Sequence, residues 1–453
     1  MKKLQNKKSQ TKRIYLDFAA QTMPSQKVLL EMEKIQSQNF NPSSIYSEGM
    51  MAENILQNSR DKISRILGVR NQEIYFTSNS TLSCATAILG TVSFYKESPS
   101  QSKTTANQRN KKYILPHIIT SNIEHAAVLE NVKFLERMGE IEVSYIAADE
   151  EGIISVADVI KEIKDNTILI SIIYANNEVG TIQDLKNISK GIQEWKKKNQ
   201  KDIEDNFNYP YFHTDASQAG NYLSLNVQTL GVDLLSLNGS KIYGPKSSAL
   251  LLKKENINLS PIYFGGGQER NLFSGTVDVE KCWGLAVALE EAQKKIKLEK
   301  NGKNNNKKFL EKLSVKRNNL WKKISEKIPE AKLIGAWNDN NWRENKKDIL
   351  REERIAKRLP NNLSIWLPDF PSDEMVIRLD QRGFAISAGS ACSAQESEFS
   401  QVIFNIMKNK YSSEQAKKIA RETIRITIDD QIKEKDLEKF MKVLKEIYFK
   451  FKV

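Results

Sequence analysis

The sequence has little of what disulfide-rich, zinc-binding and membrane-spanning proteins depend on. Its 453 residues include three unevenly spaced cysteines, Cys84, Cys282 and Cys392, which argues against a disulfide framework and for a reducing compartment. There are three histidines and no cluster of His and Cys, so we expect no metal site. No apolar run approaches the roughly 20 residues that a membrane span needs. The basic residues 1–13 lack the apolar region of a secretory signal and hold a single Arg, which favours the cytoplasm over the mitochondrial matrix.

The net charge of +13 is concentrated in polar, low-complexity stretches. Residues 1–13, 96–112 and 294–308 together hold more than this excess, so the rest of the chain is slightly acidic. A fold built to bind nucleic acid would keep its positive charge on the folded body. We therefore expect a solvated tail, solvated loops, another exposed insertion at 338–354, and no nucleic-acid partner.

Short apolar runs alternate with helical patterns through the first part of the chain. We interpret seven of these runs as buried strands, at 72–80, 112–120, 141–147, 167–175, 209–215, 232–238 and 248–254. Apolar strands separated by helices predict a mostly parallel sheet that is covered on both faces.

The pattern changes beyond about residue 290, where apolar runs at 361–368 and 422–428 precede a helical C-terminus. The expected fold class is therefore α/β, in two domains. A large domain with the mostly parallel sheet would span 14–290, and a smaller α+β domain would span 291–453. The N-terminal segment 1–25 is expected to pack with the smaller domain.

Polar residues follow five of the predicted strands, where parallel sheets bind their ligands. Ser80 and Thr81 open a helix whose first N–H groups would suit a phosphate, although an ordinary N-cap is the simpler interpretation. His125 lies near another helix start, and a lone histidine is more often structural. The other strand ends carry "NNEVG" with Asn177, "HTDASQAG" with Asp215 and Gln218, and "NGSK" with Asn238, Ser240 and Lys241. Together these clusters predict one polar crevice.

Lys241 is the most informative of these residues, because it lies in a tight turn of small residues between two apolar runs. A lysine amine there can form a Schiff base with an aldehyde cofactor. Asp215 can keep a pyridine nitrogen protonated, which turns the ring into an electron sink. An imidazole such as that of His125 can stack on the ring, and the helix start at Ser80 can hold a phosphate. The residues thus predict a site for pyridoxal 5′-phosphate (PLP).

Ordered motifs run along nearly the whole chain. They are "IYLDFAAQTMP" (14–24), "NPSSIYSEG" (41–49), "IITSNIEHAAVLE", "NNEVGTIQD", "HTDASQAG", "SKIYGPK", "GGGQERNLFSGT" (265–276), "AISAGSACSA" (385–394) and "TIRITI" (423–428). In this order they resemble the class V aminotransferase-like PLP enzymes, and within them the NifS/IscS cysteine desulfurases. The resemblance implies the PLP-dependent transferase fold (fold type I). It also implies removal of sulfur from L-cysteine, giving L-alanine and an enzyme-bound persulfide. The implied partners are a second copy in a homodimer and a sulfur-acceptor protein for iron–sulfur cluster assembly, tRNA thiolation or both.

The resemblance also implies roles for individual residues. Lys241 would bind PLP covalently, His125 would stack on its ring and shuttle protons, and Asp215 would pair with the ring nitrogen. Near the phenolic oxygen of the ring would lie Gln218 and Asn177. The phosphate would be bound by Ser80, Thr81, Asn238 and Ser240 and, across a dimer interface, by Thr276. Arg425 would bind the substrate carboxylate, with Asn41 nearby, and Cys392 would be the thiol that accepts the sulfur.

The sequence departs from the family pattern at several positions. Residues 82–85, "LSCA", lack the usual acid and amide, and Asn238 and Ser240 stand where serine and histidine are common. Further departures are Ile45, Tyr46 and Ser47, in place of a basic residue and a histidine, and Asp429 and Asp430, in place of Gly-Arg.

Two alternatives to desulfuration stay open at this point. One is another class V PLP reaction, such as selenocysteine cleavage or transamination, and the other is a catalytically silent scaffold of a sulfur-transfer complex. Cys392 argues for desulfuration, because its small, polar surroundings suit a thiol that must move. Cys84 and Cys282 lie in apolar helical patterns and are expected to be buried core thiols.

Overall fold

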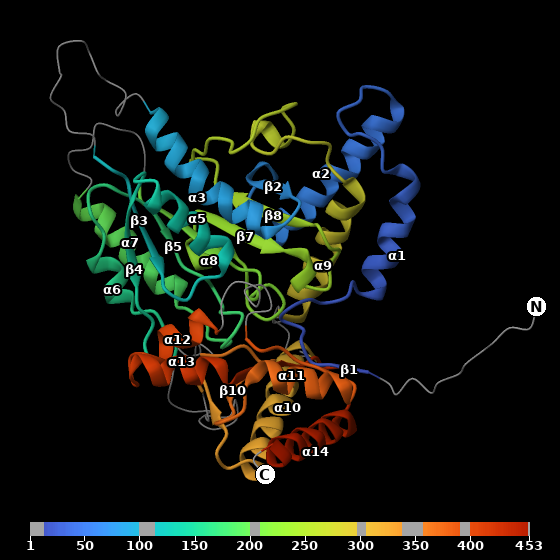
Figure 1. Cartoon of the computed structure of the whole chain (residues 1–453). Coiled ribbons are helices and arrows are strands. Elements are labelled where there is room, and N and C mark those ends of the chain that lie inside the picture. Colours follow the sequence, from blue (N-terminus) through green and yellow to red (C-terminus); the bar gives the residue numbers. More distant parts are fainter. Residues whose placement is uncertain are drawn as a thin grey trace, which may run out of the picture.

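The computed structural model (Figure 1) describes residues 13–98, 114–199, 209–296, 305–337, 357–389 and 399–451. The stretches expected as solvated loops lie largely outside these residues. The loop expected at 294–308 is shorter than predicted, because one helix extends to Ile296 and the next begins at Asn305.

The central sheet has seven strands in the order β2-β8-β7-β6-β5-β3-β4. Their bounds are β2 (Ile74–Thr77), β3 (His117–Ser121), β4 (Glu142–Ile146), β5 (Thr167–Ser171), β6 (Tyr211–Asp215), β7 (Leu234–Asn238) and β8 (Ala249–Lys253). β8 runs antiparallel to β2 and β7, and the other pairs are parallel. Each strand coincides with one of the apolar runs, so the predicted α/β sheet is confirmed.

The described residues also contain thirteen α-helices. They are α1 (Gln26–Ile35), α2 (Ser47–Leu67), α3 (Ser80–Glu97), α5 (Ala126–Arg137), α6 (Val156–Lys161), α7 (Leu185–Asn199), α8 (Val227–Leu230), α9 (Val279–Ile296), α10 (Asn305–Lys327), α11 (Ser372–Gln381), α12 (Gln401–Met407), α13 (Ser413–Arg421) and α14 (Glu434–Phe451). In the part of the chain that is described, no helix has the length and apolarity needed to cross a bilayer.

Both faces of the central sheet are buried at β5, where successive residues point to opposite sides and all are buried. Leu169 of β5 belongs to the same buried cluster as Ile88 of α3 and Val132 of α5. The next residue, Ile170, belongs to a larger cluster with Leu67 of α2 and residues of α7 and α9. Cys84 and Cys282 are 0% and 6% exposed, which confirms that they are core thiols.

The later part of the chain forms smaller sheets below the central one in Figure 1. Strands β9 (Lys332–Leu333), β10 (Asn362–Trp366) and β12 (Thr423–Thr427) form an antiparallel sheet in the order β12-β10-β9. β1 (Ile14–Tyr15) pairs in parallel with β11 (Phe384–Ala385), and the Thr427 amide donates to Leu16 O at 2.8 Å. The N-terminal segment therefore runs from this part of the fold toward the central sheet. The domain boundary near residue 290 stays a prediction.

Candidate active site

The parallel strands β3, β5, β6 and β7 all end at one edge of the central sheet. β2 ends there too, because β2 and β7 both run antiparallel to β8. The residues that follow these ends are Ser80 after β2, His125 after β3 and Asn177 after β5, while Asp215 and Asn238 are the last residues of β6 and β7. Ligands of parallel sheets bind at this edge, so the strand ends assemble one polar site.

Lys241 ends the short turn η4 (Gly239–Lys241), which directly follows β7. A Cβ on Gly239 would lie 2.3 Å from Ser248 Oγ, so only glycine fits this turn. The half-buried Lys241 amine donates to the carbonyl oxygens of Ala19, at 3.0 Å, and Ala20. The N-terminal segment therefore orients the lysine.

Two other predicted residues, Asp215 and Gln218, lie at or just after the end of β6, the strand that pairs with β7. Gln218 donates from Nε2 to Ala19 O at 2.9 Å, the same carbonyl that accepts from Lys241. Asp215 is 4% exposed, and its Oδ1 accepts from the amide of Ser217 at 2.9 Å. The Ser217 hydroxyl is buried without a hydrogen-bond partner among the described residues. The strand end at β6 therefore combines an oriented carboxylate with a buried hydroxyl that has no partner among the described residues.

His213 lies two residues before Asp215 and so shares its face of β6. Its ring nitrogens lie 2.8 Å from Ser171 Oγ on β5 and 3.0 Å from Ser236 Oγ on β7. Burial lowers the pKa of His213 to about 4, although the negative charge of Asp215 acts in the opposite direction. A neutral imidazole thus joins three strands beside Asp215.

The residues predicted to bind phosphate meet at the start of α3. Asn79 caps the helix by accepting from an amide of the first turn at 2.9 Å. The first amides of a helix have no partner within it, so those of Ser80 and Thr81 are available to an anion. Asn238 donates to Ser80 Oγ at 3.1 Å and accepts from Ser240 Oγ at 2.9 Å. Asn238 therefore connects the strand end of β7 to the helix start.

His125 is the N-cap of α5, as its place at a predicted helix start suggested. Its Nδ1 accepts from the amide of Ala127 at 3.0 Å. When the imidazole is neutral, the proton is therefore on Nε2, which can donate it.

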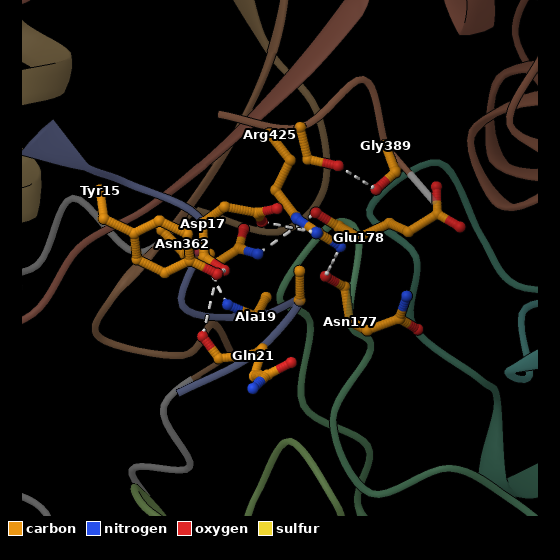
Figure 2. A network of polar contacts seen from close by, with 12 residues as sticks. Tyr15, Asp17, Ala19, Gln21, Asn177, Glu178, Asn362, Gly389 and Arg425 are labelled. Atoms are coloured by element: carbon orange, nitrogen blue, oxygen red, sulfur yellow. Dashed lines mark hydrogen bonds and ion pairs between the residues drawn. The ribbon is translucent and has the colours of Figure 1, made fainter. Parts of the chain in front are cut away.

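Arg425 is 2% exposed and lies in β12, within the smaller sheet. Its Nη2 donates to Asp17 Oδ1 at 2.8 Å and its Nη1 to Asn177 O at 3.0 Å. Figure 2 shows the guanidinium between these groups, with Glu178 beside it. Arg425 Nε is buried without a partner among the described residues. One donor of the guanidinium is therefore still unpaired.

Glu178 and Asp17 are site residues to which the sequence analysis gave no role. The Glu178 carboxylate accepts from Ser400 Oγ at 2.5 Å and lies 3.2 Å from where a Cβ on Gly389 would be. Burial raises the pKa of Glu178, while the Ser400 hydrogen bond and the charge of Arg425 act in the opposite direction. The acid in "NNEVG" was the sequence signal for Glu178, whereas no local pattern pairs Asp17 with Arg425.

Three predicted residues are not joined to this site. Asn41 and Thr276 are exposed, and the recorded hydrogen bond of the Asn41 side chain is local, to the amide of Ser43 at 3.0 Å. Cys392 lies outside the described residues. The roles inferred for these three residues stay predictions.

The donor set fits PLP. A lysine amine and a buried carboxylate lie at the adjacent ends of β7 and β6, and an anion-binding helix start follows β2 at the same edge, as the aldehyde, ring nitrogen and phosphate of PLP require. Asn177 Oδ1 and Ser217 Oγ are buried at this edge without partners among the described residues. Unsatisfied buried polar atoms are costly, so their presence at one strand edge is consistent with a polar ligand there.

Comparisons with known proteins agree with this geometry. Residues 14–314 match the family described as Aminotransferase class-V. A cysteine desulfurase IscS of Clostridium botulinum is 32% identical over 437 residues, which cover 96% of this chain and 94% of the relative. Another, of Dictyoglomus turgidum, is 32% identical over 440 residues and covers 97% and 95%.

Solved structures are similar over nearly the whole chain. A NifS-like protein has a TM-score of 0.76 at 28% identity, covering 96% of this chain and 99% of the other. SspA, solved in complex with cysteine, has a TM-score of 0.65 at 30% identity and covers 92% and 98%. The family resemblance and the fold class inferred from sequence are therefore confirmed. The chain belongs to the class V aminotransferase family of PLP-dependent enzymes and, within it, to the IscS-like cysteine desulfurases.

Proposed function

We propose that this protein is a cysteine desulfurase that converts L-cysteine to L-alanine and leaves the sulfur as a persulfide on Cys392. One observation carries the proposal: a short N-terminal segment joins the two ends of the site. Ala19 and Ala20 accept from the Lys241 amine, and Asp17 pairs with Arg425. A free amino acid is held by its amine and its carboxylate, so a cofactor lysine and a buried arginine that both bond to the same N-terminal segment suit it. The relative SspA, solved in complex with cysteine, supports L-cysteine as the substrate.

The cofactor would be PLP, which when bound supplies an aldehyde for the substrate amine and a ring that withdraws electrons from the breaking bond. Lys241 would hold its aldehyde carbon and Asp215 its ring nitrogen. The remaining contacts would be Gln218 and Asn177 to the phenolic oxygen, and Ser80, Thr81, Asn238 and Ser240 to the phosphate.

The chain's own residues would then orient the substrate and move its protons. Arg425 would bind the carboxylate, because its unpaired Nε–H is a donor available to an anion. The Lys241 amine would also serve as a base for the substrate. His125 would donate or accept at Nε2, since its Nδ1 accepts from the Ala127 amide.

Sulfur transfer needs a thiolate outside the substrate, and Cys392 would supply it. An S–S bond forms between Cys392 and the substrate sulfur while the C–S bond breaks. The electron pair of the C–S bond stays with carbon, which takes up a proton to become L-alanine. Cysteine and thiol thus give alanine and persulfide without any external oxidant.

We further propose a homodimer in which Thr276 reaches the partner's phosphate site. Ile45, Tyr46 and Phe264 are 94%, 58% and 85% exposed, which is unusual for large apolar side chains. Burial of these side chains against a second copy would account for them. The persulfide would pass to an acceptor protein for iron–sulfur cluster assembly or tRNA thiolation, in the reducing environment of the cytoplasm.

Sulfide release from L-cysteine, measured with and without dithiothreitol, tests the proposal. We expect sulfide to depend on the reductant, and L-alanine to form in equal amount to the sulfur removed. Cys392→Ala should still bind PLP and L-cysteine, seen as a change in visible absorbance, but release almost no sulfur. Wild-type sulfur release by Cys392→Ala would overturn the proposal.

A further inference from the structure

Arg425 and Thr427 of β12 both face N-terminal residues 17–19, because residues two apart in an extended strand share a face. Arg425 pairs with Asp17 at 2.8 Å, and Thr427 Oγ1 accepts from the Ala19 amide at 3.0 Å. The next residue in this series is Asp429, two residues beyond the strand.

Asp429 bonds to the turn that carries the cofactor lysine. Its Oδ2 accepts from the hydroxyl of Tyr243, which lies two residues after Lys241. Its Oδ1 accepts from the Gln431 amide at 2.9 Å, so both carboxylate oxygens are used. Asp429 is 5% exposed. At this position the family pattern often has glycine, which has no side chain to make such a bond.

Tyr243 is held on its backbone as well as on its hydroxyl. Its φ of 60° is left-handed, a conformation that a bulky residue adopts only when its surroundings fix it. Its amide donates to Thr22 Oγ1 at 2.8 Å, and its carbonyl accepts from the Ser25 amide at 2.9 Å. The turn after Lys241 is therefore tied to the N-terminal segment by its backbone and to Asp429 by its side chain.

We propose that Asp429, acting through Tyr243, is a positioning residue that fixes the separation between the cofactor lysine and the substrate arginine. Neither side chain supplies a group to the reaction. An amino acid bound to both Lys241's cofactor and Arg425 requires these two groups at a set distance. The Tyr243–Asp429 hydrogen bond ties the chain two residues after Lys241 to the chain four residues after Arg425. This inference rests on the proposed function.

The test compares Asp429→Ala, Tyr243→Phe, the double variant and Asp429→Asn with the wild type, each loaded with PLP. We expect KM for L-cysteine to rise about five- to tenfold in each of the first two, as for one lost part-buried hydrogen bond, with kcat changed less than twofold. The double variant should be no worse than either single variant, because both remove the same bond. Asp429→Asn should bring KM back toward that of the wild type, because its amide can still bond to the Tyr243 hydroxyl, by accepting at the oxygen or by donating from the nitrogen.

Two further measurements separate positioning from general destabilisation. Tyr448→Phe removes another buried hydroxyl of the same part of the fold, which donates to Pro368 O at 3.0 Å, and should leave KM unchanged. In the apo-proteins, amide hydrogen exchange over residues 16–25 should quicken in Asp429→Ala and Tyr243→Phe but not in Tyr448→Phe.

Unchanged KM in both single variants, additive effects in the double variant, or an Asp429→Asn as impaired as Asp429→Ala would each overturn the inference. If the wild type lacks desulfurase activity, the proposed function fails. The exchange experiment still decides whether Asp429 ties the turn in place, since unchanged exchange would overturn that tie.

Discussion

The two ends of the site are built in different ways. At the cofactor end, Asp215, Asn238 and Lys241 belong to neighbouring strand ends of one sheet, and the sheet itself fixes their spacing. At the substrate end, Arg425 reaches the site from another sheet and pairs with Asp17, 408 residues away in the chain. The first end is a property of one sheet, whereas the second exists only when distant parts of the chain meet. Substitutions at the two ends should therefore fail in different ways.

Lys241→Ala should give the largest effect and should leave the fold intact. The lysine amine donates to the carbonyl oxygens of Ala19 and Ala20, and its side chain is half-buried, so its loss removes contacts to the N-terminal segment rather than part of the core. We expect turnover to fall by at least about 1000-fold and covalent PLP to disappear, with thermal unfolding little changed. Lys246→Ala, at an exposed lysine five residues on, is the matched control and should behave as the wild type. Full activity in Lys241→Ala would rule out the assignment.

Asp215→Ala should come next, again without loss of the fold. Without this carboxylate the ring nitrogen of bound PLP would be less protonated and the ring a weaker electron sink. We expect kcat to fall by about 100-fold or more while PLP stays covalently bound, visible as an altered absorbance band. A kcat within tenfold of the wild type would mean that Asp215 does not serve the ring nitrogen.

Arg425→Ala should affect both binding and stability, which distinguishes the substrate end. Loss of the guanidinium should raise KM for L-cysteine by about 100-fold, because charge-assisted hydrogen bonds to the carboxylate are lost. It also leaves Asp17 buried without its partner, which should lower the free energy of unfolding by about 3–5 kcal/mol.

The double variant Asp17→Asn/Arg425→Ala separates these two effects. It should recover much of the stability, since no charge is left unpaired, but none of the KM. Urea unfolding and steady-state kinetics on the same preparations measure both. A double variant that recovers KM would show that Arg425 only supports the fold.

The contrast between the two ends also explains what the sequence could predict. Strands, the turn at Lys241, and helix starts at Ser80 and His125 follow from local patterns of apolar and small residues, and the structure has all of them. The pairing of Arg425 with Asp17 and of Tyr243 with Asp429 depends on how the smaller sheets meet the central one. No local periodicity encodes that arrangement, so these contacts could not be foreseen. Asp429 was visible only as a departure from the family pattern, with no indication of its partner.

The smallest expected effect is that of His213→Gln, which changes how the free energy of unfolding depends on pH. A comparison with a second buried histidine then separates the cofactor end from the rest of the central sheet. The pKa of His213 is about 4 in the folded protein because of burial, below its ordinary value of 6.5. Between these pH values the unfolded chain binds a proton that the folded chain does not, so the free energy of unfolding falls as pH falls through this window. His213→Gln removes this contribution. The stability difference between wild type and variant should therefore shrink by about 2 kcal/mol from pH 7.5 to pH 5.

His117 provides the matched comparison, because burial also lowers its pKa to about 4, but it bonds to Thr167 and Ser144 rather than lying beside Asp215. His117→Gln should show the same pH dependence of unfolding by urea. Only His213→Gln should in addition shift the visible absorbance of bound PLP, since only His213 shares a strand face with Asp215. Equal absorbance shifts in both variants, or none in His213→Gln, would mean that His213 stabilises the sheet without influencing the cofactor end.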